Sequence, residues 1–438
     1  MSSVLTDIIK NIDAASLYIN LVAIGQFIKN WWWVVPPFLL WGTFKKLYLF
    51  WLNERWDRTV KRILLEIKIP ENVFKPIKAM DHVFASFHGI HDIVSPREKW
   101  IEGVFQLTLS FEIVSIDGEI HFYIRTPEMF RSFIETNIYS QYSEAEVSLV
   151  DDYTKYVPQD IPNKDWDLWG VDFINPKDEI YPIKTYPNFE EAKEPLEEKR
   201  IDPLAVLLEG MTALKPGEQF WVQIVAKPVL GKDKPWQEKG RQLADKLARR
   251  PEIEKPKPIL SEAADLLISG TPPGSKKEEE LQVFPPEMKL TPGEREILMA
   301  IEQKLAKFGY DCNCRFLYLG KRDVFFKPRT KVGFGFFKEV STENLGGLKP
   351  WSKTMTKVKS VPLWFLDKRR LFLRKRRMLR YYCKRWPTLF PRKGATYILN
   401  TEELATLYHF PGRMVAPAVG VSRVEAKKGG APPTLPVE

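Results

Sequence analysis

An apolar, aromatic-rich segment near the N-terminus constrains this chain more than any other feature. Residues 14–52 hold the densest run of hydrophobic side chains, and Trp-Trp-Trp-Val-Val-Pro-Pro starts at Trp31. A membrane-spanning helix needs about 20 apolar residues, and 31–52 reaches that length if Lys45 and Lys46 extend toward lipid headgroups. Tryptophan at both ends is typical of a membrane interface, and a span tolerates a proline pair. We therefore predict a membrane anchor over 1–60 that contacts lipid through Trp31, Trp32, Trp33, Trp41 and Trp51.

The number of membrane segments stays open, whereas the orientation of the anchor follows from the charges around it. The earlier apolar run at 17–28 is short for a span, so it either lies in the interface or completes a hairpin. A buried core helix is the alternative to a membrane anchor, and it fits a triple tryptophan beside two prolines poorly. Basic residues follow the segment and few precede it, so the positive-inside rule predicts an inner-membrane protein whose body faces the cytoplasm. Three cysteines without disulfide or zinc spacing agree with a reducing compartment.

The residues after the anchor predict an α+β body. From 61 to 155 the pattern reads β-α-β-β-α-β, with a long strand from Trp100 to Ile116 and a hairpin turn at Asp117-Gly118. This order is the split βαβ of a ferredoxin-like domain. We predict a second, similar unit over 160–345, in which one strand is not obvious. Residues 250–290 are rich in Pro, Lys and Glu and predict a flexible insertion.

Signatures of nucleotide binding and catalysis are absent from the sequence. Gly270-Thr-Pro-Pro-Gly274 has three residues between its glycines where a P-loop needs four, and a serine separates the second glycine from Lys276. His88 and His91 form the one histidine cluster, without a third ligand at metal-binding spacing. We therefore expect neither enzymatic activity nor a cofactor or metal.

The positive charge of the chain is concentrated in one stretch. The net charge is +10, and about a dozen Lys and Arg with no acid lie between Lys368 and Lys393, within a basic aromatic segment at 346–395. Phe365, Phe372, Leu379 and Trp386 recur every seven residues, which predicts one apolar helix face. The cations could bind DNA phosphates, an anionic membrane leaflet or an acidic partner, or form a solvated face. The candidate binding residues are Arg369, Arg370, Arg374, Lys375, Arg376, Arg377, Arg380, Lys384 and Arg385.

A connector over 396–438 follows this stretch. It predicts a strand at 396–399, an N-cap at Asn400 or Thr401, and a short helix before Pro411. Its Thr-Glu-Glu-Leu-Ala-Thr-Leu-Tyr-His-Phe-Pro-Gly at 401–412 and Val-Glu-Ala-Lys-Lys-Gly from Val424 resemble the connector before the motor domain of membrane-anchored type IV secretion and conjugation ATPases of the FtsK/HerA superfamily. Shorter stretches of similar sequence lie at 119–127, 139–142, 217–225 and 342–345.

The resemblance implies a role beside a motor. In such ATPases the nucleotide-binding core follows the connector, whereas this sequence reaches Glu438 without a P-loop. We expect the anchor and accessory region alone, encoded apart from its motor or truncated. The first hypothesis is a non-enzymatic scaffold that positions a separately encoded P-loop ATPase and forms a homo-oligomer with it. The alternative is a membrane-tethered nucleic-acid-binding protein that holds DNA through residues 368–393.

Overall fold

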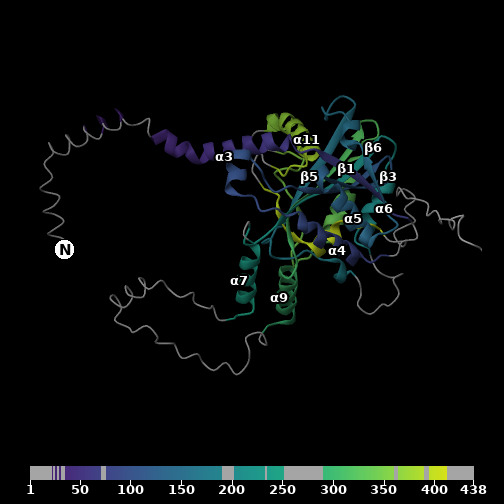
Figure 1. Cartoon of the computed structure of the whole chain (residues 1–438). Coiled ribbons are helices and arrows are strands. Elements are labelled where there is room, and N and C mark those ends of the chain that lie inside the picture. The colour runs from purple at the N-terminus through teal and green to yellow at the C-terminus, as the bar shows by residue number, and fades with distance from the viewer. Residues whose placement is uncertain are drawn as a thin grey trace, which may run out of the picture. The chain divides into compact units, whose positions relative to one another are not determined.

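The computed structural model describes most of the chain in two compact units. The described residues are 22, 25–26, 29–30, 35–70, 75–189, 202–231, 234–250, 290–359, 364–388 and 394–411 (Figure 1). Unit 1 combines Met1–Lys61 with Ile93–Phe105, and unit 2 combines Arg62–Asp92 with Gln106–Glu438. Each unit is described by itself below.

Unit 1 is built on the helix α3 (Val35–Asp57), against which a later segment packs. The ring of Trp56 meets that of Phe105 edge-on at 5.0 Å, and the ammonium of Lys45 lies 4.8 Å from the ring centre of Trp100. Trp100 belongs to the π-helical turn η3 (Glu98–Glu102). The expected strand from Trp100 to Ile116 is therefore wrong in its first half, because these side chains pack on α3 instead of alternating in a sheet.

Unit 2 is built on one antiparallel sheet, which confirms the predicted α+β class. Its strand order is β4-β1-β3-β2-β6-β7-β5-β8, and β9 pairs with the first residues of β7. The Asp117-Gly118 turn joins β2 to β3 as predicted, with both residues at positive φ. The strands are β1 (Arg62–Lys68), β2 (Leu109–Ile116), β3 (Glu119–Pro127), β4 (Glu146–Val150), β5 (Trp166–Ile174), β6 (Glu218–Val229), β7 (Gly309–Lys321), β8 (Lys349–Pro350) and β9 (Tyr397–Asn400).

The sheet contains the same strand pattern twice. In the first half the order along the chain is β-α-β-β-α-β, and the order across the sheet is β4-β1-β3-β2. In the second half β5, β6, β7 and β8 take the equivalent places, in the order β8-β5-β7-β6. The last strand of the second half, β8, has two residues and lies just past the predicted end of the second unit at 345. The halves join where β2 pairs with β6.

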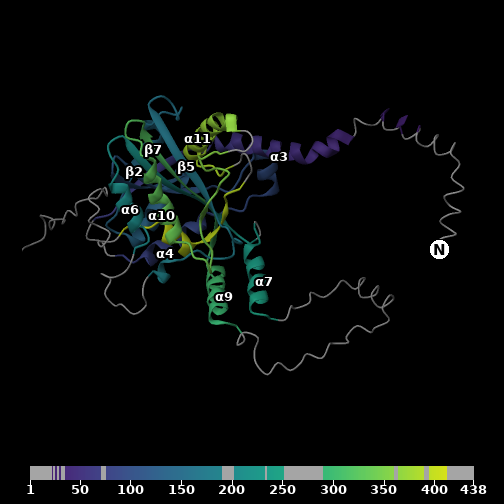
Figure 2. The ribbon, with the colours of Figure 1, turned by 180° about the vertical axis from the view of Figure 1, so that it is seen from behind.

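Helices cover the two faces of the sheet unequally. On one face, α4, α5, α6, α10 and α12 bury a large apolar core that includes Met80, Ile134 and Leu404. On the other face, α11 packs with a segment that contains Tyr153 and Ile161. Figures 1 and 2 show α11 on the side of the sheet opposite α4 and α6. These helices are α4 (Ile77–Phe87), α5 (Arg131–Gln141), α6 (Ala205–Thr212), α10 (Lys331–Glu339), α11 (Asp367–Lys384) and α12 (Thr401–Leu407).

A helix pair interrupts the second half between β6 and β7. It consists of α7 (Trp236–Leu247) and α9 (Pro292–Leu305), which share a small core through Ala244 and Ile301 (Figure 1). Thr291 caps α9 in a capping box with Glu294. Nearly all of the expected flexible insertion, residues 251–289, lies outside the described residues.

Candidate interface for an anionic partner

The basic stretch folds mainly into α11, and only its C-terminal half is buried. Met378, Leu379 and Tyr382 are buried against the sheet. The predicted apolar face is therefore wrong in its first half, because Phe365 and Phe372 remain 64% and 41% exposed. A seven-residue repeat drifts around a helix of 3.6 residues per turn, and the sheet contacts α11 only near its end.

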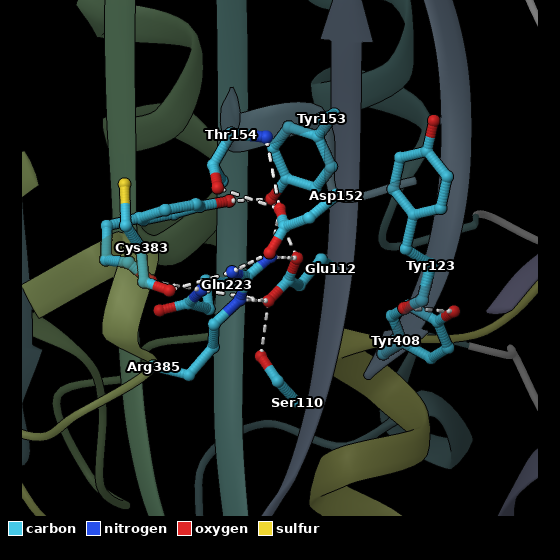
Figure 3. Close-up of polar contacts among 11 residues, drawn as sticks. Ser110, Glu112, Tyr123, Asp152, Tyr153, Thr154, Gln223, Cys383, Arg385 and Tyr408 are labelled. Carbon is cyan, nitrogen blue, oxygen red and sulfur yellow. Dashed lines mark hydrogen bonds and ion pairs between the residues drawn. The ribbon is translucent and has the colours of Figure 1, made fainter. Parts of the chain in front are cut away.

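A buried ion-pair cluster fixes the C-terminal end of α11 (Figure 3). Arg385 caps the helix in the left-handed conformation, with φ of 54°. Its Nε and Nη2 donate to the carboxylate of Glu112 on β2 at 2.9 and 3.1 Å, and its Nη1 donates to Asp152 at 2.6 Å. Tyr153 donates a further hydrogen bond to Glu112 at 2.7 Å, and Gln223 donates one at 2.9 Å. Every oxygen of the buried Glu112 carboxylate is therefore paired.

The electrostatics of this cluster depend on Arg385. Burial by itself raises the pKa of Glu112, but the charge and hydrogen bonds of Arg385 and the hydrogen bonds from Ser110 and Tyr153 together outweigh burial, so the pKa lies below its usual value. Asp152 behaves in the same way: burial raises its pKa, and the contacts with Arg385 and Thr154 together lower the pKa by more than burial raises it. Burial by itself lowers the pKa of Arg385, but the contacts with Glu112, Tyr153 and Asp152 together outweigh burial, and the pKa lies well above its usual value. The cluster is thus charged at neutral pH.

A second buried cluster holds the chain just after α11. Asp172 on β5 forms an ion pair with Arg315 on β7 at 3.2 Å and accepts a hydrogen bond from the hydroxyl of Thr388 at 2.5 Å. Arg315 also donates to the backbone oxygen of Trp386 at 2.6 Å. The two clusters belong to one row of residues in register across six strands: Glu66, Tyr123, Glu112, Gln223, Arg315 and Asp172.

At least three of the nine candidate cations contact acceptors inside the fold. Arg385 is buried in the first cluster, and Lys375 forms a 2.5 Å ion pair with Asp167. Arg374 donates from Nη1 to the backbone oxygens of Ser352 and Met355 at 3.2 and 3.1 Å. We call Arg374, Lys375 and Arg385 the inward cations, since their groups are directed at protein acceptors rather than at a partner.

Four of the other six candidates lie on the exposed side of α11. Arg369, Arg376 and Arg380 follow the i, i+7, i+11 spacing of a single helix stripe, and all three are exposed. Arg376 donates one long hydrogen bond of 3.5 Å to the backbone oxygen of Asp160, and its guanidinium lies 5.1 Å from the ring centre of Phe372. The ammonium of Lys384 lies 4.3 Å from the ring centre of Trp386. Arg370 and Arg377 have interaction partners within the protein. We call the remaining four residues the outward cations: Arg369, Arg376, Arg380 and Lys384.

The sequence reasoning missed the acids that hold α11. Glu112 occurs in Leu-Ser-Phe-Glu-Ile-Val and Asp172 in Gly-Val-Asp-Phe-Ile, each a single carboxylate within an apolar strand. A charge in such a strand requires a buried partner, so these two residues carried a usable signal. The identity of the partner was not readable, because Arg385 lies 273 residues after Glu112.

The connector segment is integrated into the fold. Asn400 caps α12 in a capping box with Glu403, which confirms the predicted cap. Glu403 is fully buried, forms a 3.1 Å ion pair with the buried Lys304 of α9, and accepts a hydrogen bond from the Ile183 N–H at 2.8 Å. Residues from Thr401 to Phe410 are almost all buried in the sheet core. Gly412 and the second part of the motif lie outside the described residues.

The structure describes two of the five predicted anchor tryptophans. Trp41 and Trp51 on α3 are exposed by 61% and 55%, and their rings take part in a chain of aromatic contacts with Phe44 and Tyr48. Trp31, Trp32 and Trp33 lie outside the described residues. Within the part of the chain that is described, no helix combines the length and the apolar character that crossing a membrane requires.

The histidine cluster takes part in packing. The ring of His88 stacks on Phe308 at 4.7 Å and lies 6.2 Å from the ring of His91. Burial lowers the pKa of His88. Among the described residues, no group of three or more His, Cys, Asp or Glu side chains is placed to hold a metal ion.

No protein-family model matches the sequence, and no curated protein matches it. The resemblance to type IV secretion ATPases therefore stays a prediction that rests on the motif residues.

Proposed function

We propose that this chain is a non-enzymatic scaffold that positions a type IV secretion or conjugation-type P-loop ATPase at the inner membrane. The observation that carries the proposal is the burial of the connector segment 401–410 in the sheet core. A connector tied to the body by a buried ion pair cannot swing independently of it. A motor joined or docked at this point would therefore be held in a defined orientation by the sheet and its helices.

The strand topology supports a scaffold. We interpret each half of the sheet as a ferredoxin-like unit, since both share the chain order β-α-β-β-α-β and the sheet order 4-1-3-2. Joining the two units edge to edge through β2 and β6 removes one exposed strand edge from each. The result is a single rigid sheet, which suits a protein that fixes the position of others.

The exposed aromatic side chains of α3 support a location at the membrane. Trp41, Phe44 and Trp51 present large apolar rings to the surroundings of α3, where water would be a poor solvent for them. Tryptophan and tyrosine favour the headgroup region of a bilayer. In the proposal, this helix contacts lipid while the basic residues around it remain on the cytoplasmic side.

Crosslinking from the connector tests the proposal. A photoreactive amino acid is placed at Pro411, directly after the buried segment, in the tagged full-length chain expressed in its own cells. After irradiation, membranes are solubilised and the crosslinked proteins are identified by mass spectrometry. We expect a P-loop ATPase among the products.

A matched control uses the same photoreactive residue at Lys215, in the turn before β6, which should give no ATPase adduct. Recovery of the chain from membranes without any P-loop ATPase, crosslinked or bound, would refute the scaffold. Equal ATPase crosslinking from 411 and 215 would refute the role of the connector.

A further inference from the structure

The outward side of α11 combines exposed cations with exposed apolar side chains. Four large apolar residues at its N-terminal end are exposed: Trp364 by 75%, Phe365 by 64%, Phe372 by 41% and Leu373 by 45%. Trp364 and Phe365 belong to the 3-10 turn η10 (Trp364–Leu366), which leads directly into α11. Soluble surfaces rarely gather apolar side chains of this size, and such a patch marks an interaction site.

The charge of this surface selects an anionic partner. The four outward cations are exposed, and no acidic residue occurs between Lys368 and Thr388. The inward cations already neutralise Asp167, Glu112 and Asp152. The outward cations therefore form a separate basic surface, from Arg369 to Lys384, that runs for about 22 Å along the helix axis.

The shape of the surface favours a plane over a small ligand. A cavity beside α11, lined by Lys353, Arg374 and Arg377 among others, holds about 10 Å³, which is room for a single water. It cannot enclose a phosphate group. The outward side of α11 is instead a convex helix surface, on which cations and apolar rings lie together.

We propose that the outward side of α11 binds the surface of an anionic lipid bilayer. The guanidinium and ammonium groups contact acidic headgroups, while Trp364, Phe365, Phe372 and Leu373 enter the boundary between headgroups and acyl chains. Duplex DNA would satisfy the cations but would leave four apolar side chains in water. The inward cations and the buried Tyr382 hold the helix in place, so binding requires no folding step.

A fluorescent label on α11 tests the proposal in the full-length chain. An NBD group, whose emission rises in an apolar environment, is attached to a cysteine at Leu373 in a chain whose Cys383 is replaced by serine. Vesicles contain phosphatidylcholine alone or a 7:3 mixture with phosphatidylglycerol, in roughly the proportion of an anionic inner leaflet. We expect a several-fold rise in emission with the mixed vesicles only. A label at Lys215 should not respond.

Paired charge variants make the test specific. Replacing two outward cations in Arg376→Gln/Arg380→Gln should raise the lipid concentration for half-maximal response roughly 30-fold, since each cation near an anionic surface contributes about a factor of five. The control Lys239→Gln/Arg241→Gln removes the same charge from exposed positions of α7 and should leave the midpoint unchanged. Unfolding curves in urea verify that both variants remain folded.

Three results would overturn the proposal. The first is an NBD label at 373 whose emission does not rise with anionic vesicles, although flotation shows that the chain is bound to those vesicles through another segment. The second is an equal midpoint shift in both charge variants. The third is binding of a 30-nucleotide DNA that the Arg376→Gln/Arg380→Gln variant loses, together with NBD emission that does not change when vesicles are added. That result would assign the surface to nucleic acid.

Discussion

The two sides of α11 carry the same kind of residue and use it differently. Arg385 is fully paired with Glu112 and Asp152 inside the fold, whereas Arg380, one and a half turns earlier, is exposed. The first cation stabilises the attachment of the helix, and the second is available to a partner. A basic stretch is therefore not one functional feature. Its cations divide according to whether a carboxylate of the body reaches them.

Removing the buried cation should have the largest effect. Arg385→Met leaves the carboxylate of Glu112 buried without a counter-ion, and breaking a buried pair in this way costs about 3 to 5 kcal/mol. Arg380→Met removes an exposed cation of the same helix and should change stability by less than about 0.5 kcal/mol. Urea unfolding of both variants measures the difference. Equal losses would show that burial does not distinguish the two sides.

The loss in Arg385→Met should depend on pH. In the folded protein, Glu112 and Asp152 have pKa values below their usual 4.5 and 3.8. The two carboxylates therefore stabilise the fold fully at pH values above their usual pKa values, and this stabilisation is lost as the pH falls through their lowered pKa values. In the variant, burial without Arg385 should raise the pKa of Glu112. Glu112 then takes up a proton at a higher pH than in the native chain, and this removes the unpaired buried charge that destabilises the variant. We expect the stability difference from the native chain to shrink between pH 7 and pH 4.5, and a constant difference would contradict this.

Removing the half-buried ion pair between Lys375 and Asp167 should have an intermediate effect on stability. Lys375→Met removes the ion pair with Asp167, which keeps a hydrogen bond from its neighbour Leu168 N–H. We expect a loss of about 1 kcal/mol, close to a typical net hydrogen bond. A double-mutant cycle with Asp167→Asn measures the coupling, which should account for most of the loss. A coupling energy near zero would mean that Lys375 does not stabilise the fold through Asp167 and should be grouped with the outward cations.

The outward cations should have the smallest effect on stability. Neutralising Arg369, Arg376 and Arg380 together should lower the free energy of unfolding by less than about 1 kcal/mol, and reduced like-charge repulsion could even raise it. Differential scanning calorimetry at low and moderate salt measures whether the triple variant is less stable or more stable than the native chain. A loss as large as that of Arg385→Met would mean that these residues hold the fold and are not reserved for a partner.

The local structure was largely predictable from the sequence. The hairpin at Asp117-Gly118, the N-cap at Asn400 and the α+β class follow from residue types and spacing over a few positions. Such features depend on backbone preferences and neighbouring hydrogen bonds, which a sequence displays directly. The strand expected from Trp100 failed, because an alternating pattern does not say that its aromatic residues pack on α3.

The candidate interface was predictable only in part. The sequence located the cations and the helix, but it assigned Phe365 to a buried face and treated Arg385 as a binding residue. Both errors have one cause. The buried side of α11 is set by the strands it crosses, and those strands come from residues hundreds of positions earlier in the chain.

The aromatic N-terminal segment, the α+β body and the concentrated stretch of positive charge can all be recognised from the order of residue types. Tertiary structure alone decided which of those charges are inside. Charge density is a local property, and it is set by residue types alone. Pairing requires a carboxylate within about 4 Å, and only folding brings Glu112, Asp152 and Asp167 within that distance of α11.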